Sequence, residues 1–181
     1  MKKTRPWVAF YSFTGSEIVN LIRNLPSDDG ELIRPDCVCT NNYEGQINFV
    51  ERNIYYSQWG EHEYREILSQ FDNPVVTLNG WMRIIPAQIC DEFEIYNGHP
   101  ALISEYPELK GKDKQEDVIN QVDKYPLIGS VIHRCTPVLD DGEIVEEERV
   151  HNMQVVDEHL IYEILKNTSL ITWLRFLPTV L

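Results

Sequence analysis

Short runs of β-branched and aromatic residues alternate with longer amphipathic runs over the first hundred residues, and this alternation constrains the fold most strongly. The runs of strand composition cover residues 7–11, 36–40, 74–78 and 93–97. Between them, apolar residues at helical spacing predict helices over residues 17–25, 46–53, 61–71 and 86–92. Strands that alternate with helices pair in parallel through crossover connections. We therefore expect an α/β fold built on a doubly wound, mostly parallel sheet.

The second half of the chain has a different pattern, which predicts an antiparallel addition to that sheet. An irregular loop over residues 98–111 precedes the elements expected there, which are a helix over 112–122, strands over 129–136 and 144–149, and helices over 155–167 and 169–176. The turn over residues 137–142 joins the two strands directly, as antiparallel neighbours require. A length of 181 residues favours a single domain that spans residues 1–181.

An excess of acidic residues limits the partners of this chain. Lys and Arg number 16 against 29 Asp and Glu, which gives a formal net charge of −13. This charge repels phosphate backbones and anionic membranes, so neither nucleic acid nor membrane is expected as a partner. Uncharged apolar stretches such as residues 170–174 are far shorter than the roughly 20 residues of a membrane span, and the first residues run into no apolar signal segment. The cytoplasm is the expected compartment.

The cysteines do not have the spacing of a metal site or a disulfide framework. None of them forms a Cys-x-x-Cys pair, and Cys37 and Cys39 lie in an alternating apolar run. We expect all four thiols to be reduced and mostly buried, and we expect no metal.

Ligands of doubly wound sheets bind beyond the carboxyl ends of the strands, so the residues at those ends are the candidate site. After the first strand, Gly15 and Ser16 open a helix whose first N–H groups could hold a phosphate or carboxylate. Thr14 and Glu17 could instead form a capping box that satisfies the same N–H groups. Both interpretations stay open, because Glu17 places a negative charge where an anion would bind.

The loop after the third strand combines a glycine turn with Trp81, Met82 and Arg83. Main-chain groups beside such side chains could hold a flat heterocycle through hydrogen bonds and apolar contact. The alternative is ordinary packing of the apolar residues under the next helix.

The fourth strand ends at Asn97, an amide donor, and His99 follows two residues later with a titratable ring. This pair has the chemistry that stabilises an oxyanion and moves a proton near neutral pH. Asp140 lies 140 − 99 = 41 residues further on, so only the fold can bring it to His99. A carboxylate there would orient the ring and favour its charged form. The alternative for Asp140 and Asp141 is a turn between two strands, which is compatible with the first interpretation.

These motifs, in this order, resemble the folate-dependent formyltransferase family, and most closely the phosphoribosylglycinamide formyltransferases of purine synthesis. The resemblance covers roughly residues 7–176 and rests on the Gly15–Ser16 turn and on residues 78–85, 97–103, 106–109, 129–133 and 139–145. It implies a Rossmann-type formyltransferase fold and 10-formyltetrahydrofolate as the co-substrate that donates the formyl group.

The resemblance also implies roles for individual residues. It assigns catalysis to Asn97, His99 and Asp140, with Asp140 preferred over Asp141 because the matching motif reads Leu-Asp-x-Gly. It places folate against two loops, largely through main-chain groups, with the contacting residues Met82, Arg83, Ile84, Ile85, Val138, Asp140 and Asp141. Ser130 and His133 would lie close by in a supporting or water-positioning role.

The acceptor is the least determined part of the prediction. The resemblance implies a small-molecule primary amine, with glycinamide ribonucleotide as the default and another amino-nucleotide or amino-sugar as the variant. Gly15, Ser16 and Glu17 would contact it, although the charge of Glu17 opposes a phosphate unless the side chain turns away. Lys110 is a further candidate, and Lys112 and Lys114 follow it closely. These lysines suit an anionic acceptor and a solvated helix start equally well.

Two other functions are weighed against transfer. One is hydrolysis of 10-formyltetrahydrofolate, although the hydrolases of the family usually carry an extra amino-terminal domain and this chain begins at the first strand. The other is a non-enzymatic acidic interaction protein. Its acidic residues would need to form one continuous face, whereas here they are scattered along the chain.

Overall fold

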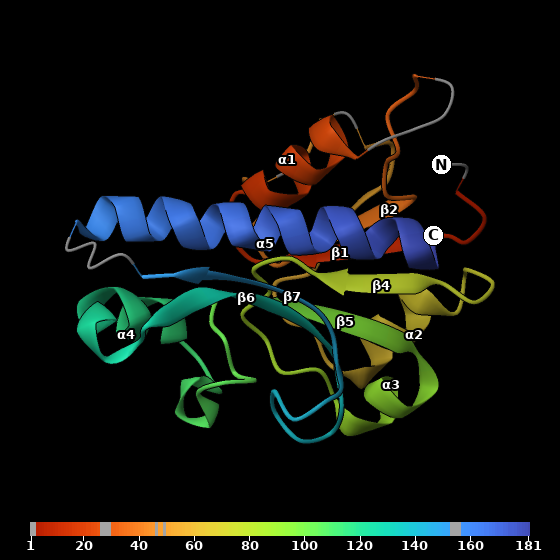
Figure 1. Ribbon diagram of the computed structural model, residues 1–181. Helices are drawn as coiled ribbons and strands as arrows, with labels where there is room; N and C mark the ends of the chain where they lie inside the picture. The colour runs from red at the N-terminus through yellow and green to blue at the C-terminus, as the bar shows by residue number, and fades with distance from the viewer. Residues whose placement is uncertain (1–2, 26–29, 46, 49, 153–156) are drawn as a thin grey trace.

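The computed structural model describes residues 3–25, 30–45, 47–48, 50–152 and 157–181, and these residues form a single sheet of seven strands covered by helices (Figure 1). The strands are β1 (Trp7–Tyr11), β2 (Cys37–Thr40), β3 (Asn53–Tyr55), β4 (Val75–Leu78), β5 (Glu94–His99), β6 (Leu127–Arg134) and β7 (Ile144–His151). The α-helices are α1 (Ser16–Asn24), α2 (Glu61–Leu68), α3 (Ala87–Glu92), α4 (Lys114–Asn120) and α5 (Glu158–Val180). Short 3₁₀ turns cover Pro107–Leu109 and Val122–Lys124.

The order of the strands across the sheet is β3-β2-β1-β4-β5-β6-β7. The first five of these strands are mutually parallel, while β6 is antiparallel to both of its neighbours. The expected mostly parallel sheet with an antiparallel carboxyl-terminal addition is therefore confirmed. β6 runs antiparallel directly beside β5, so residues of both strands meet at the carboxyl end of β5.

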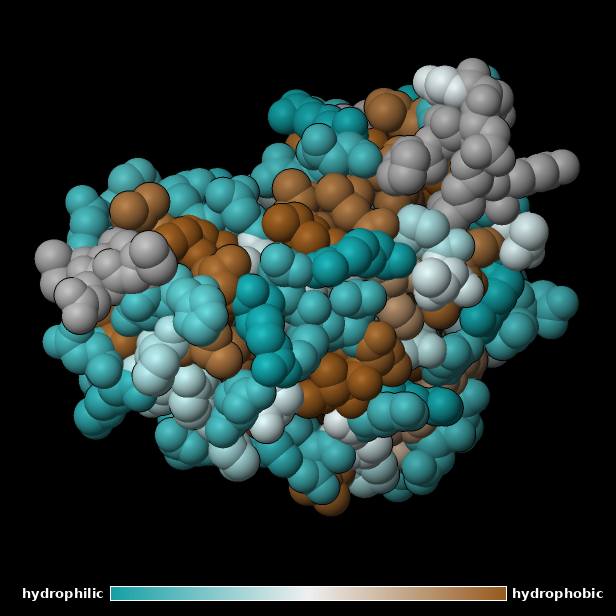
Figure 2. Space-filling model, viewed as in Figure 1, coloured by the Kyte–Doolittle hydropathy of each residue, from teal (hydrophilic) through white to brown (hydrophobic). Residues whose placement is uncertain are grey.

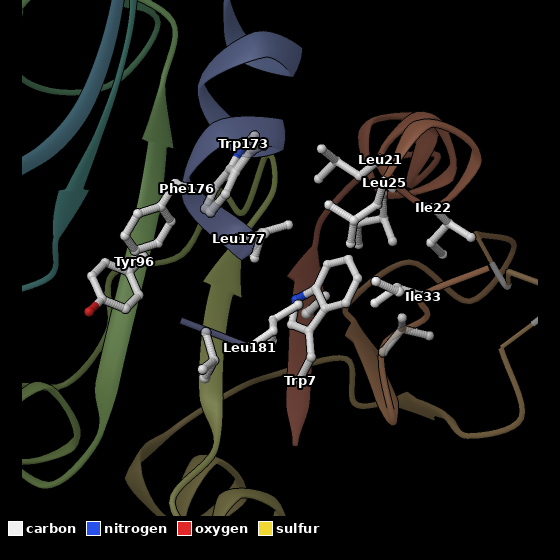
Figure 3. Packing of buried hydrophobic residues seen from close by; sticks show 14 of the residues in the cluster. Trp7, Leu21, Ile22, Leu25, Ile33, Tyr96, Trp173, Phe176, Leu177 and Leu181 are labelled. Carbon is white, nitrogen blue, oxygen red and sulfur yellow. The ribbon is translucent and has the colours of Figure 1, made fainter. Parts of the chain in front are cut away.

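Helices cover both faces of the sheet, which explains why the central strands β1, β2 and β4 are buried along their whole length. Helices α1 and α5 pack on one face, where Trp7 and Trp173 are fully buried (Figure 3). Tyr96 of β5 meets Phe176 of α5 with 4.6 Å between the ring centroids. Helices α2 and α3 cover the opposite face (Figure 1). In the view of Figure 2, polar side chains divide the hydrophobic surface into separate patches.

The prediction of a helix over residues 46–53 is wrong. In the described part of this range, residues 47–48 and 50–52 are not helical, and Asn53 begins the edge strand β3. The side chain of Asn53 accepts from Ile47 N at 3.0 Å and donates to Val50 O at 2.8 Å. Such side-chain bonds to the main chain replace the bonds that a helix would make. Residues 46 and 49 lie outside the described residues.

The two helices expected at the end of the chain form one continuous helix, α5. It begins after Asp157, whose side chain accepts from Leu160 N at 3.1 Å, and residues 155–156 of the expected range lie outside the described residues. The expected break falls at Thr168, whose hydroxyl instead donates to Leu165 O at 2.9 Å within the helix. A polar side chain whose hydrogen bond is made within the helix does not end a helix that is packed against a sheet.

All four cysteines lie within the described residues and are free thiols, with Cys135 half-buried and the others buried. In the described part of the chain, no helix has both the length and the apolar character needed to cross a bilayer.

Candidate active site

The candidate catalytic residues meet at the carboxyl end of β5. Asn97 and His99 lie on this strand, and His133 of β6 is the register partner of Asn97 across the antiparallel ladder. Asn97 Nδ2 lies 3.1 Å from His133 Nε2. The fold thus brings together an amide and two imidazoles from adjacent strands.

Asp140 joins this group from the turn between β6 and β7. Its carboxylate lies 3.6 Å from His99 Nδ1 and 3.3 Å from His133 Nε2, one oxygen toward each ring. The backbone of Asp140 has a φ of 51°, a left-handed conformation that Asp and Asn tolerate better than most residues. His99, His133 and Asp140 are 5%, 2% and 7% exposed, so the group is almost completely desolvated.

Main-chain groups fix the protons of both rings. His99 Nε2 lies 2.8 Å from Leu109 O, and His133 Nδ1 lies 3.1 Å from Arg134 O. A carbonyl oxygen only accepts, so each of these nitrogens carries the hydrogen. His99 Nδ1 and His133 Nε2 are therefore the nitrogens that face the Asp140 carboxylate.

Burial and charge shift the pKa values of the facing pair. Burial lowers the pKa of His99 below its ordinary value, against the opposing effect of the Asp140 carboxylate. Burial also acts to raise the pKa of Asp140. The neighbouring rings of His133 and His99 and the Gly111 N–H outweigh burial there, so the pKa of Asp140 is lowered. Asp140 is thus a stable carboxylate at neutral pH.

Two main-chain contacts of the site come from a segment that the sequence did not single out for catalysis. Leu109 O accepts from His99, and Gly111 N donates to Asp140 Oδ2 at 2.8 Å. Both residues belong to the loop after β5, where Pro107–Leu109 forms a 3₁₀ turn. The available signal was the length and proline content of residues 98–111, which indicated a functional loop without naming its atoms.

The expected folate-binding residues differ in exposure. Met82, Ile84 and Val138 are 38%, 77% and 61% exposed, whereas Ile85 is buried. Arg83 is exposed, and Asn41 accepts from its Nε at 3.0 Å when the Asn41 amide is oriented with Oδ1 toward the guanidinium.

Gly15 and Ser16 form the turn that opens α1, as expected, but the capping box of Thr14 and Glu17 is not formed. Gly15 is the N-cap residue with a φ of 68° and makes no side-chain cap, and among the described residues the Thr14 hydroxyl accepts only from Ser16 N, at 3.3 Å. The Glu17 carboxylate instead accepts from the Ser169 hydroxyl of α5 at 2.6 Å. Burial raises the pKa of Glu17, although the Ser169 hydroxyl and the nearby Trp173 indole act to lower it.

The remaining candidates are engaged in other contacts. Lys110 pairs with Asp141 at 2.5 Å, and Lys112 and Lys114 each lie beside an aspartate of their own segment. Ser130 is buried and contacts Thr168 of α5 at 2.9 Å, so the structure does not bring it to the histidines.

One group in the described part of the chain has the composition and geometry to hold a metal ion. It consists of His99, His133 and Asp140, which each offer one ligand atom within 4.8 Å of the others. The sequence did not indicate this group because its members are far apart in the chain.

Solved structures with the same fold have known activities. A phosphoribosylglycinamide formyltransferase from Anaplasma phagocytophilum superposes with a TM-score of 0.80 and 19% identity, over 97% of this chain and 85% of that one. The corresponding enzyme from Campylobacter jejuni gives a TM-score of 0.81 and 15% identity, over 99% of both chains. A formyltetrahydrofolate deformylase from Pseudomonas syringae gives a TM-score of 0.74 and 20% identity, over 96% of this chain and 60% of that one.

The sequence itself matches a known protein family. No curated protein matches the sequence as a whole. A family model described as formyl transferase matches residues 39–169, a range that includes Asn97, His99 and Asp140. The resemblance drawn from the sequence is confirmed, and the chain belongs to the formyl transferase family and is an enzyme of that type.

Proposed function

We propose that this chain transfers a formyl group from 10-formyltetrahydrofolate to a primary amine, and that glycinamide ribonucleotide is the acceptor. The observation that carries the proposal is the desolvated group of Asn97, His99 and Asp140 at the carboxyl end of β5, with 3.6 Å between His99 and Asp140. An amide, an imidazole and a carboxylate in this arrangement supply both oxyanion stabilisation and proton transfer.

The reaction begins with attack of a neutral amine on the formyl carbon. Negative charge then develops on the formyl oxygen, and the Asn97 amide and the protonated His99 ring stabilise it. His99 Nε2 is occupied by Leu109 O, so Nδ1 is the nitrogen that gains and loses the proton. The Asp140 carboxylate beside Nδ1 favours this transfer.

The proton balance involves the same two residues. After attack, the amine nitrogen must lose one proton, and Asp140 accepts it directly or through water. Cleavage of the bond between the formyl carbon and the folate nitrogen then requires a proton on that nitrogen, which the His99–Asp140 pair returns. The proposed transfer uses no metal.

The surface around the group suits folate. The exposed apolar side chains of Met82, Ile84 and Val138 provide contact area for a pterin ring. Asp141 is paired with Lys110, so the turn would bind the ring through its main-chain groups. Arg83 supplies a cation for the anionic part of the folate.

The first turn of α1 supports a phosphate-bearing acceptor. The Thr14 hydroxyl accepts from the Ser16 N–H at 3.3 Å, the N-cap Gly15 has no side chain to cap the turn, and the helix dipole favours an anion there. The Glu17 carboxylate accepts from the Ser169 hydroxyl rather than from this turn, and burial raises its pKa. The objection that the sequence raised against a phosphate is therefore weakened.

The test combines purified protein with 10-formyltetrahydrofolate and glycinamide ribonucleotide, and follows both tetrahydrofolate release and the formylated amine. We expect equal amounts of the two products. An Asp140→Asn variant that still binds folate serves as the inactive control. If the wild type binds folate but releases no tetrahydrofolate with this acceptor or with amino-sugars and other amino-nucleotides, the transferase proposal fails.

Hydrolysis is the second candidate, because a formyltetrahydrofolate deformylase shares the fold. The same experiment separates the two functions. Release of formate and tetrahydrofolate without an added amine, at the rate seen with it, would identify a hydrolase. We further propose the cytoplasm as the compartment, since the four free thiols suit a reducing environment.

A further inference from the structure

Two histidine nitrogens and the two carboxylate oxygens of Asp140 lie close together at the centre of the site. His99 Nδ1 lies 3.6 Å from one oxygen of Asp140, and His133 Nε2 lies 3.3 Å from the other. Both outer ring nitrogens carry hydrogens for Leu109 O and Arg134 O, so in the neutral rings the inner nitrogens present lone pairs. Two lone pairs thus face one carboxylate, although that of His133 Nε2 also lies 3.1 Å from the Asn97 amide Nδ2. A cation that displaces the Asn97 amide from His133 would satisfy all three groups.

The surroundings of the two rings are those of metal-binding histidines. A histidine that binds a metal through one nitrogen usually donates its other N–H to a carboxylate or a backbone carbonyl, which fixes the ring. Both His99 and His133 do so. Gly111 N fixes the Asp140 carboxylate at 2.8 Å. The ligands are thus held in place before any ion binds.

We propose that His99 Nδ1, His133 Nε2 and the Asp140 carboxylate bind a divalent transition-metal ion of the Zn²⁺ type, and that the metal-bound protein is inactive in formyl transfer. Two imidazoles and one carboxylate suit Zn²⁺, Co²⁺ or Ni²⁺, whereas Mg²⁺ and Ca²⁺ prefer oxygen ligands. The fourth position of a tetrahedral ion would remain open to water.

The observed distances are compatible with such an ion. Bonds of about 2.0–2.1 Å in a tetrahedral site place neighbouring ligand atoms about 3.3 Å apart. The measured separations of 3.3 and 3.6 Å run to different oxygens of Asp140, and one ligand atom from each of the three residues lies within 4.8 Å of the other two. A small inward movement of one ring completes the site.

Charge and access also favour binding. In the described part of the chain, Asp140 forms ion pairs with the two histidines alone, so no Lys or Arg competes with the ion. The neighbouring side chains of Val138 and Leu139 are 61% and 54% exposed, and Asn97 is half-buried. An ion can therefore reach the group from the side of the turn between β6 and β7.

Inhibition follows from the overlap of the two roles. The ion would occupy His99 Nδ1 and the Asp140 carboxylate, the same groups that move protons in the proposed transfer. This part of the inference rests on the proposed function, whereas metal binding itself does not.

The binding test uses the untagged full chain after treatment with a chelator, in the absence of substrates. Equilibrium dialysis should give one Zn²⁺ per chain, and Co²⁺ should produce a visible absorption band typical of nitrogen and oxygen ligands. His133→Gln and Asp140→Asn should each weaken Zn²⁺ binding more than about tenfold, since loss of even an outer partner costs about that much. His62→Gln, on the exposed face of α2, should bind like the wild type. Mg²⁺ should not compete.

Absence of stoichiometric Zn²⁺ binding would overturn the proposal, as would equal affinity in the wild type and in both ligand variants. Near-ultraviolet circular dichroism identifies any variant that does not fold, and the conclusion then rests on the other variant and on the cobalt spectrum. The activity test adds Zn²⁺ to the transfer reaction and reverses inhibition with a chelator. An inactive protein that still binds Zn²⁺ would contradict the proposed function and leave the metal site intact.

Discussion

At the scale of single residues, His99 is the most direct test of the proposed reaction. Replacement of His99 by Ala removes the ring that faces Asp140 and donates to Leu109 O. We expect turnover to fall at least about a hundredfold, by analogy with removal of an oxyanion donor, while folate binding is largely retained. Steady-state kinetics and a folate titration measure the two quantities. His62→Ala is the control, and near-normal turnover of His99→Ala would remove His99 from the mechanism.

Glu17 gives a prediction about pH and stability. Burial raises its pKa above the ordinary value of 4.5, so the folded protein binds a proton at Glu17 more tightly than the unfolded chain does. The associated stabilisation is present below the unfolded pKa and is lost as the pH rises through the folded pKa. We expect Glu17→Gln to be free of this loss, because the amide keeps an oxygen that can accept from Ser169.

The measurement is the free energy of unfolding in urea between about pH 5 and pH 8. The gain of Glu17→Gln over the wild type should grow toward the higher pH. Glu66→Gln, an exposed substitution on α2, should show no such trend. A constant difference between Glu17→Gln and the wild type across this range would show that the carboxylate does not titrate there.

At the scale of elements, the close contact between β5 and α5 restricts the size of the side chain that β5 can carry. Gly98 lies between Asn97 and His99, the proposed catalytic residues of β5, and a Cβ built on it would lie 2.7 Å from Trp173 Nε1. We expect Gly98→Ala to destabilise the protein by about 1–3 kcal/mol through overpacking, and to lower turnover because Asn97 and His99 move with the strand.

Unfolding and kinetic measurements on Gly98→Ala should be paired with those on Gly98→Ala/Trp173→Phe. The smaller ring should recover part of the lost turnover if the clash with Trp173 is the cause. Gly60→Ala is a milder control, since its Cβ would meet only the Glu63 side chain, at 3.2 Å. Normal turnover in Gly98→Ala would show that β5 tolerates the shift.

The sequence predicted the elements whose patterns are local, and missed those that depend on distant contacts. Strands β1 and β4 and helix α2 were expected close to their observed positions, because apolar periodicity reports burial directly. Residues 47–48 and 50–52 were misassigned because the side chain of Asn53 binds the main chain of Ile47 and Val50. Thr168 was taken for a break, although its hydroxyl bonds within α5.

The same distinction applies to the site. Side-chain chemistry at strand ends indicated Asn97, His99 and Asp140, and the fold brings them together. The contributions of Leu109 O and Gly111 N could not be predicted, because every residue has these main-chain groups and only loop geometry selects them. The position of His133 opposite Asn97 depends on the register between two strands.

At the scale of the whole molecule, the net charge of −13 sets the long-range field around the site. The three lysines near the site are paired with aspartates, so they do little to reverse it. An anionic acceptor is therefore repelled at low ionic strength, and salt screens the repulsion. We expect KM for glycinamide ribonucleotide to fall, with kcat unchanged, when salt rises from about 0.01 to about 0.15 M and the Debye length shortens from about 30 to about 8 Å.

Initial rates at several salt concentrations provide this test. A matched measurement with an uncharged amine, if one is accepted, should show little dependence of KM on salt. A KM for the nucleotide that rises with salt would mean that local cations such as Arg83 dominate over the overall charge. Binding to DNA at low salt is not expected for the same electrostatic reason.

The pairing of Asn97 with His133 across β5 and β6 has a consequence for inactivation by heat. The hydrogen-bonded ladder that holds these strands together also sets the spacing of the reacting groups. The strand pairing and the geometry of the site therefore cannot be lost separately. Central strands open only when the whole fold opens. Loss of activity on heating should therefore follow the melting of the sheet, and substitutions that strengthen this ladder far from the reacting groups should prolong the working life of the enzyme.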